Sequence, residues 1–203
     1  MVHDTAEIQN AEIGNGAYIG ALCLIGEPAE NRATWPETPF GVEIHDGAIL
    51  CGLVTVDAGT VRNTVIGKRV MLMKHSHVGH DALIGDDCTL ACGVKIGGHC
   101  ELGRWVNMGL NSVVHPRVKV PQGCMIGAGA VVTKTTDMKP FCCYVGNPAR
   151  FLRWNQKAID LAGLTPEQVT EIQNEWVNKS CFLAASEKDS SLTFEEFLHA
   201  KTK

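Results

Sequence analysis

The sequence predicts an all-β solenoid, in which short strands wind into stacked coils. A large aliphatic residue occupies every sixth position from Ile66 to Met138 without a break. Six is a multiple of the strand period of two, so in an extended chain these residues point to one side, whereas in a helix they would scatter over three faces. The repeat therefore indicates strands that share one core. The positions are Ile66, Leu72, Val78, Ile84, Leu90, Ile96, Leu102, Met108, Val114, Val120, Ile126, Val132 and Met138.

Two further positions of the repeat support this interpretation. The fourth residue after each aliphatic is small or β-branched, which suits a second inward position in a narrow core. The residue directly after the aliphatic is often glycine, which suits a tight corner between short strands. Four cysteines share the small inward position, so we expect core residues rather than reactive thiols there. They are Cys23, Cys88, Cys100 and Cys124.

The N-terminal part carries the same repeat in other frames. Ile13, Ile19 and Ile25 form one frame, and Ile44 begins the next. The frame breaks at roughly 26–43 and 57–65, and three prolines in the first break predict a loop that leaves the coil. Loops on a rigid scaffold often carry substrate contacts. We therefore expect residues 1–140 to form the solenoid, with a loop excursion at about 26–43.

Residues 141–203 are expected to form a helical region. A first helix is predicted to open at 147–150 and to end near Gly163. Thr165, Pro166 and Gln168 form a capping pattern for a second helix, which should run to about Lys179. Thr193 with Glu196 repeats that pattern for a third, short helix. We expect these helices to pack on the last coils and to cover the open strand edge.

Composition restricts the classes of partner. The chain has 203 residues and a net charge of -4, with acids and bases mixed along it, so it lacks the basic footprint of a nucleic-acid or anionic-membrane protein. We find no signal peptide and no apolar run long enough for a membrane span. Nine cysteines in such a chain favour a reducing, cytoplasmic location.

The repeat resembles the hexapeptide repeat of the left-handed parallel β-helix, where three hexapeptides make one triangular coil of eighteen residues. The left-handed sense comes from the resemblance, because the general rule for parallel crossovers gives the opposite hand. Flat, mostly uncharged faces of such a prism favour self-association. The resemblance implies a homotrimer whose active sites lie between subunits.

Position within the eighteen-residue coil predicts which histidines meet. His80, His99 and His115 take positions 8, 9 and 7 of the coil, so all three are expected at one corner of coils stacked about 4.8 Å apart. His77 and Asp81 flank this group. A single histidine at a turn is usually a surface residue, but the shared corner favours a site. Imidazole can accept a proton from a hydroxyl and return it near neutral pH.

Gly98 lies at the same corner, one coil above His80. A glycine leaves its backbone N–H unshielded, and such a group can stabilise a developing oxyanion. Gly97 and Gly98 together would also suit a plain corner. The sequence thus leaves both a catalytic and a purely structural interpretation of this pair open.

The segment His77-Val78-Gly79-His80-Asp81, followed by Gly97-Gly98-His99 and His115, is similar to the UDP-N-acetylglucosamine O-acyltransferases of lipid A biosynthesis, and the similarity runs from about Ile25 to Gln173. This resemblance implies transfer of an acyl group from an acyl carrier protein or coenzyme A thioester to a hydroxyl of a nucleotide sugar. It implies no cofactor and no metal. For catalysis, it implies that His80 is the general base and that Gly98 donates a hydrogen bond to the oxyanion.

The resemblance also implies binding roles. His77 and Asp81 would contact or orient the acceptor, and His99 would support the acceptor or the base. His115 would line the groove for the phosphopantetheine arm or the nucleotide. Asn155 would lie near the nucleotide phosphates.

Three alternatives remain open. The segment Tyr144 to Arg150 resembles the end of coenzyme A-dependent sugar acetyltransferases, which form amides or esters. A zinc hydratase like the γ-class carbonic anhydrases would use His75 and His80, but Pro39 or Ile44 stands where the third ligand is expected. The third alternative is a non-catalytic scaffold, favoured by a changed acceptor segment, where residues 30–33 replace the family's Gln-Asp-Leu-Lys.

Overall fold

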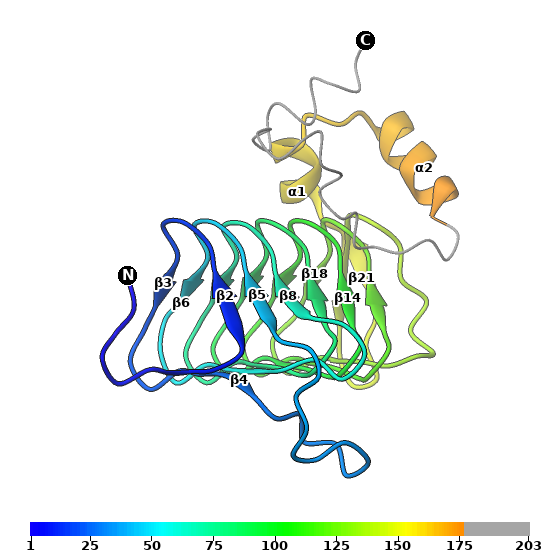
Figure 1. Ribbon diagram of the computed structural model, residues 1–203. Helices are drawn as coiled ribbons and strands as arrows, with labels where there is room; N and C mark the ends of the chain where they lie inside the picture. Colours follow the sequence, from blue (N-terminus) through cyan, green and yellow to red (C-terminus); the bar gives the residue numbers. More distant parts are fainter. Residues whose placement is uncertain (177–203) are drawn as a thin grey trace.

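The structure is a computed structural model that describes residues 1–176, and it is a left-handed parallel β-helix with a small helical appendage (Figure 1). Each coil contributes one strand to each of three sheets. Sheet 1 contains β1 (Glu7–Ile8), β4 (Leu24–Glu27), β7 (Thr55–Asp57), β10 (His77–Val78), β13 (Lys95–Ile96), β16 (Val113–Val114) and β19 (Val131–Val132). Sheet 2 contains β2 (Ala11–Ile13), β5 (Val42–Ile44), β8 (Thr64–Ile66), β11 (Leu83–Ile84), β14 (Glu101–Leu102) and β17 (Lys119–Val120). Sheet 3 contains β3 (Tyr18–Ile19), β6 (Ile49–Leu50), β9 (Met71–Leu72), β12 (Thr89–Leu90), β15 (Asn107–Met108), β18 (Met125–Ile126), β20 (Cys142–Val145) and β21 (Arg150–Trp154).

The core consists of the residues that the six-residue period selects. Every aliphatic of the repeat from Ile66 to Met138 is buried, and so are the four cysteines of the small inward position. Parallel partners lie eighteen residues apart, as Val78 pairs with Ile96 and Ile96 with Val114. The predicted period and its core assignment are therefore confirmed.

Both breaks in the repeat leave the prism at the same edge. Residues 28–41 connect β4 to β5, and residues 58–63 connect β7 to β8, so each loop joins sheet 1 to sheet 2. Later coils pass this edge as tight turns at 79–82, 97–100 and 115–118. We call this edge, with its turns and two loops, the loop corner. Figure 1 shows the 28–41 loop below the stack of coils.

The expected helix opening at 147–150 is wrong. The parallel stacking continues beyond 140, because β20 pairs with β18 through Met125 with Cys143 and Ile126 with Tyr144. The chain then turns and returns as β21, antiparallel to β20. An open sheet edge offers unpaired backbone donors and acceptors, which favours a strand over a helix here. β21, rather than a helix, covers the edge of sheet 3.

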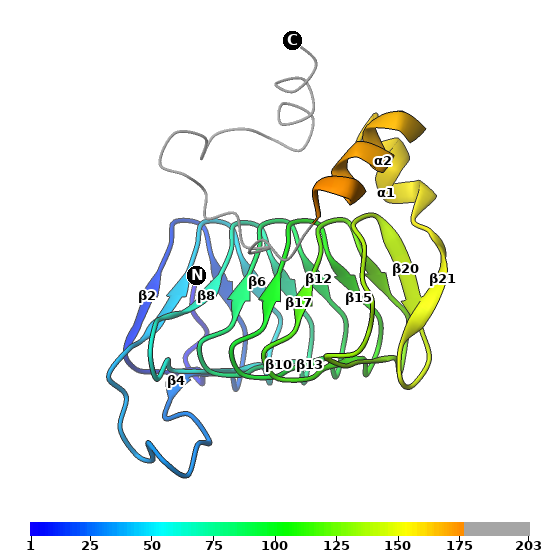
Figure 2. The ribbon, with the colours of Figure 1, turned by 90° about the vertical axis from the view of Figure 1, so that its right-hand side faces the viewer.

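Two short helices follow at the end of the prism. α1 (Gln156–Leu161) is capped by Asn155, and α2 (Pro166–Glu175) begins with the predicted capping box of Thr165 and Gln168. α2 ends before the expected Lys179, and the third helix expected at Thr193 and Glu196 lies outside the described residues. Both helices lie on the side opposite the 28–41 loop (Figures 1 and 2). No helix in residues 1–176 is long and apolar enough to cross a membrane. In this helical region, Ile159, Ala162 and Val169 form a buried apolar cluster with Phe141.

Candidate active site

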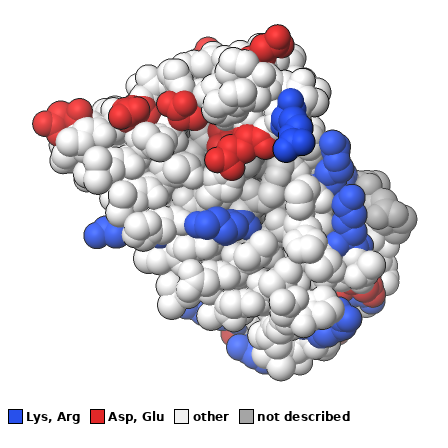
Figure 3. All heavy atoms as spheres, turned by 90° about the horizontal axis from the view of Figure 1, so that it is seen from below, with Lys and Arg blue, Asp and Glu red and all other residues white. Residues whose placement is uncertain are grey.

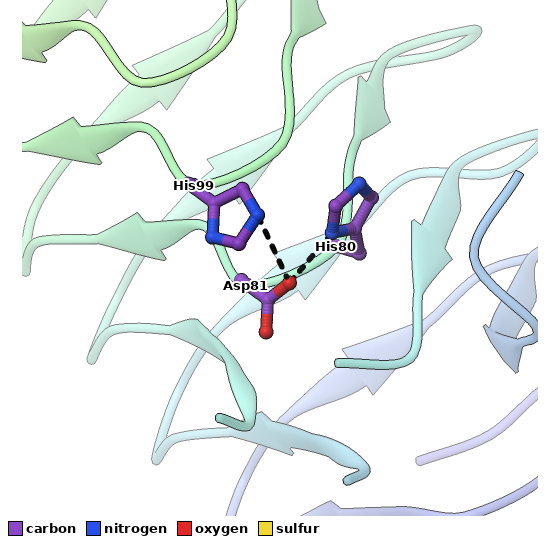
Figure 4. Close-up of side chains that lie close together, drawn as sticks. All are labelled: His80, Asp81 and His99. Carbon is purple, nitrogen blue, oxygen red and sulfur yellow. Dashed lines mark hydrogen bonds and ion pairs between the residues drawn. The ribbon is translucent and has the colours of Figure 1, made fainter. Parts of the chain in front are cut away.

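The loop corner brings His80 and His99 into contact (Figure 4). Their ring centroids are 4.9 Å apart and the planes are nearly perpendicular, while the His99 N–H donates to the His80 carbonyl at 2.8 Å. Asp81 and His99 occupy equivalent turn positions with φ of 61° and 59°. This left-handed conformation is uncommon outside glycine, and its recurrence places consecutive coils in the same corner geometry. Side chains nineteen residues apart therefore meet.

His80 is held by the carboxylate that follows it. The Nδ1 atom of His80 lies 2.6 Å from Oδ2 of Asp81, and Asp81 is completely buried. A carboxylate at Nδ1 favours the tautomer with its proton on that nitrogen, which leaves Nε2 as the acceptor. Asp81 is thus placed behind the ring, where it orients His80.

The 58–63 loop encloses Asp81 on the other side. Oδ1 accepts backbone N–H groups of Thr60 (3.0 Å), Val61 (2.8 Å) and Arg62 (3.0 Å), and Oδ2 accepts the Thr60 hydroxyl at 2.7 Å. Burial alone would raise the pKa of Asp81, but the hydrogen bonds from His80 and from this loop outweigh it and hold the pKa well below its usual range. Asp81 is therefore an anion throughout the neutral range. Sequence reasoning did not identify this loop contact.

Gly98 lies directly against the His80 ring. A Cβ atom at this position would lie 2.7 Å from Nε2 of His80, closer than real contacts allow. The N–H groups of Gly97 and His99 donate to Val114 and His80, whereas within the described residues the Gly98 N–H makes no backbone hydrogen bond. Gly98 thus leaves room, and an available donor, beside the acceptor nitrogen.

His77 lies on the outer face of sheet 1. Its Nδ1 atom is 2.8 Å from the Thr55 hydroxyl, and its Nε2 atom is 3.8 Å from Oδ2 of Asp57. Burial lowers the pKa of His77, and the charge of Lys95 lowers it further, while Glu30 opposes the shift. The ring is therefore neutral at pH 7. It opens on a cavity of about 630 Å³, lined by Leu24, Glu27, Pro28, Glu30, Trp35, Leu53, Thr55, Asp57, His75, Ser76, His77 and Lys95.

Asp57 is a second carboxyl that sequence reasoning missed. It is only 8% exposed, and burial together with the nearby Glu30 raises its pKa to about 7. It lines the cavity, and His80 opposes the rise of its pKa. The break of the repeat at 57–65 was the available signal, because Asp57 is its first residue and the last residue of β7.

The two remaining predicted residues are placed differently. His115 lies at the loop corner but is exposed, and within the described residues its ring makes no contact with His80. Asn155 caps α1, where its side chain donates to Gly123 at 2.9 Å and accepts from Ala158 at 3.4 Å. That position is on the opposite side of the prism from the loop corner. The single chain does not bring Asn155 to His80.

A basic cavity lies beside the last coils, between the loop corner and α2. It has a volume of about 470 Å³ and is lined by Arg117, Val118, Lys119, Thr133, Lys134, Thr136, Asp137, Met138, Lys139, Gln173 and Trp176. Lys134 lies three coils from His80 in the same register, which corresponds to about 14 Å at the usual strand spacing. The corner thus joins a histidine site to a basic site.

The trio of His80, Asp81 and His99 has the donor types of a metal site, since their ligand atoms lie within 4.8 Å of one another. However, Asp81 already accepts three backbone N–H groups at one oxygen and a hydroxyl and an imidazole at the other. A carboxylate offers about four lone pairs, so a metal would have to displace these donors. The set therefore fits a histidine–carboxylate base better than a metal centre.

Comparison with known proteins identifies similar acyltransferases. Residues 63–98 match the family described as bacterial transferase hexapeptide (six repeats). An acyl-[acyl-carrier-protein]–UDP-N-acetylglucosamine O-acyltransferase of Campylobacter concisus is 28% identical over 79% of this chain and 61% of its own length. The chain resembles these acyltransferases. The corresponding Helicobacter pylori protein is 40% identical over 47% of this chain.

The solved structures give the same result. The UDP-N-acetylglucosamine acyltransferase of Bacteroides fragilis superposes with a TM-score of 0.77 and 26% identity, over 85% of this chain and 68% of that one. The chain spans about 34% and 61% of the length of the Helicobacter and Campylobacter relatives. The structural resemblance thus extends over 85% of this chain and 68% of the Bacteroides fragilis protein.

Proposed function

We propose that this protein transfers an acyl group from a phosphopantetheine thioester, carried by an acyl carrier protein or coenzyme A, to a nucleotide sugar. The acceptor group is a hydroxyl, as the sequence predicts, or an amine. One observation carries the proposal: His80 is fixed at Nδ1 by a buried carboxylate and presents Nε2 toward Gly98, whose N–H makes no backbone hydrogen bond within the described residues. A metal would have to displace the hydrogen bonds of Asp81, which disfavours the zinc alternative.

In the proposed reaction, the acceptor gives its proton to Nε2 of His80 and attacks the thioester carbonyl. The carbonyl oxygen becomes an oxyanion that accepts the Gly98 N–H. The C–S bond then breaks, and the leaving thiolate takes the proton from the imidazolium. A positioned base contributes about 10² to 10⁴ in rate and one oxyanion donor about 10² to 10³.

The surroundings of His80 divide into acceptor and donor sides. His77 lines the cavity that contains Asp57, and it is proposed to contact the acceptor. His99, on the next coil, is proposed to support His80 as the base. Arg117 and Lys134 line the basic cavity and are proposed to meet phosphates of the donor arm. About 14 Å of corner separates the two sides, a span that an extended pantetheine arm can cover.

We also propose a homotrimer with sites between subunits, which accounts for two residues. His115 is exposed at the loop corner, and Asn155 is remote from His80 within one chain. In a trimer of prisms, residues on different corners of neighbouring chains can approach one another. His115 and Asn155 would then complete the donor or nucleotide contacts of a neighbouring site.

The test is His80→Ala, assayed with UDP-N-acetylglucosamine and related sugar nucleotides against acetyl-coenzyme A and acyl carrier protein thioesters. We expect the rate of transfer to fall at least about 10²-fold. The oligomeric mass should stay that of the proposed trimer. His45→Ala is the matched control, because His45 is also half-buried but lies at another corner beside Glu43. Near-normal turnover by His80→Ala, or binding of thioester without any transfer by the unaltered protein, would refute the proposal.

A further inference from the structure

The cavity beside His77 has an unusual charge balance. Three carboxyl side chains line it, from Glu27, Glu30 and Asp57, against one lysine, Lys95. The Lys95 ammonium already donates to the backbone carbonyl of His75. Figure 3 shows the underside of the prism, where acidic side chains gather along one edge, apart from most of the basic ones. The carboxyl groups of the cavity therefore outnumber its lysine.

Asp57 is the buried member of this group. It is 8% exposed, and within residues 1–176 its ion-pair contacts are limited to the long 3.8 Å approach of His77, with no lysine or arginine. A buried carboxylate is costly unless a cation or a proton compensates it. Its raised pKa, of about 7, agrees with such a missing partner. The side chain faces a cavity, so a ligand can supply the positive charge.

Glu30 comes from the 28–41 loop and lines the same cavity as Asp57. Its charge raises the pKa of both Asp57 and His77, so it lies near both. The loop is attached to the coils, since the Asn10 side chain donates to the carbonyls of Thr38 (3.2 Å) and Phe40 (2.9 Å). The two carboxyls therefore face one cavity from opposite supports, a loop and a strand.

We infer that the acceptor is an amino sugar nucleotide, whose ammonium group binds between Asp57 and Glu30 and is the group that is acylated. This inference rests on the proposed acyl transfer and narrows its acceptor. A neutral hydroxyl would leave Asp57 without a cation, whereas an ammonium compensates both carboxyls. The product is an amide rather than an ester.

The bound ammonium gives one proton to the Asp57 carboxylate, which later releases it to solvent, and the neutral amine attacks the thioester carbonyl. The C–N bond forms while a second N–H proton passes to Nε2 of His80. The C–S bond breaks, and the thiolate takes that proton from the imidazolium. One amide and one thiol result.

The test compares UDP-N-acetylglucosamine with analogues in which its 3-, 4- or 6-hydroxyl is replaced by an amine, each with acetyl-coenzyme A and an acyl carrier protein thioester. We expect kcat/KM to be at least about tenfold higher for one amino analogue, with a product that resists mild alkaline hydroxylamine. Asp57→Asn and Glu30→Gln should each reduce this amine preference about 10- to 100-fold, mainly through KM. Glu37→Gln is the control, since Glu37 is exposed on the same loop but does not line the cavity.

Faster turnover of UDP-N-acetylglucosamine than of every amino analogue would overturn the inference and leave acyl transfer standing. An amine preference unchanged in both Asp57→Asn and Glu30→Gln would also overturn it. If no acceptor turns over, the proposed function fails, and calorimetry still decides the inference: tighter binding of an amino analogue that Glu30→Gln abolishes supports it, and equal binding refutes it. Glu30 is exposed, so Glu30→Gln is expected to fold normally.

Discussion

Replacing Asp81 by asparagine tests how the carboxylate controls the His80 ring. The asparagine oxygen can still accept the N–H groups of Thr60, Val61 and Arg62 from the 58–63 loop. Its amide NH₂ then faces Nδ1 of His80, where the carboxylate now lies at 2.6 Å. Because an NH₂ group donates, Nδ1 must become the acceptor and the ring proton must move to Nε2. The base nitrogen would thus be occupied by a proton.

The magnitude follows from this tautomer change. The contribution of a positioned base is about 10² to 10⁴, so we expect Asp81→Asn to lower kcat by that factor with KM changed little. Asp81 is fully buried, and the exchange of one acceptor for a donor should cost about 1–3 kcal/mol of unfolding free energy. Steady-state kinetics and urea unfolding measure the two effects separately.

Asp86→Asn is the matched control. Asp86 also accepts a backbone N–H across a coil corner, from Lys68 at 2.8 Å, but at the corner between sheets 2 and 3. It should show a comparable small loss of stability and normal turnover. If Asp81→Asn keeps wild-type kcat, or loses no more activity than Asp86→Asn, the tautomer argument is refuted.

Three further predictions concern the same corner. Gly98→Ala should reduce kcat at least about 10²-fold without unfolding the protein, because its methyl would lie 2.7 Å from Nε2 of His80; turnover near the wild-type rate would contradict this. Thr60→Val should lose about 1 kcal/mol in urea unfolding, since the hydroxyl bond to Asp81 at 2.7 Å is removed and the backbone bond stays; an unchanged midpoint would contradict this. Asp57 has a folded pKa of about 7, above its unfolded value near 4, so its contribution to stability is present below pH 4 and is lost as pH rises through 7. Asp57→Asn should therefore flatten the fall of unfolding temperature between pH 5 and 8, and parallel pH profiles for the two proteins would disprove this.

The coils were predictable because their determinant is local and periodic. Each inward position repeats at six residues, so the core from Ile66 to Met138 follows from the chain alone. The turn into β21 was not predictable in this way. Phe151, Leu152 and Trp154 are exposed strand residues, and they form a strand because an open edge of β20 is present, which is a tertiary cause.

The site was predictable to the extent that it lies inside the unbroken frame. His80, Gly98 and His99 share the frame, and the structure brings them together. Thr60 and Asp57 lie in or beside a break that resets the numbering, so position within the coil cannot place them. Both breaks follow a strand of sheet 1, as the turn with His80 does. Recognising this shared position would have placed both loops at the corner of His80.

The constant spacing of paired residues has a consequence for variation in length. Val78, Ile96 and Val114 follow one another at eighteen residues, and no pairing crosses more than one neighbouring coil in this part of the chain. One whole winding could be added before β7 or removed there without changing how the imidazoles face the glycine amide. Prisms with fewer or more windings can then keep one reaction centre, because the number of windings and the chemistry are set by separate segments.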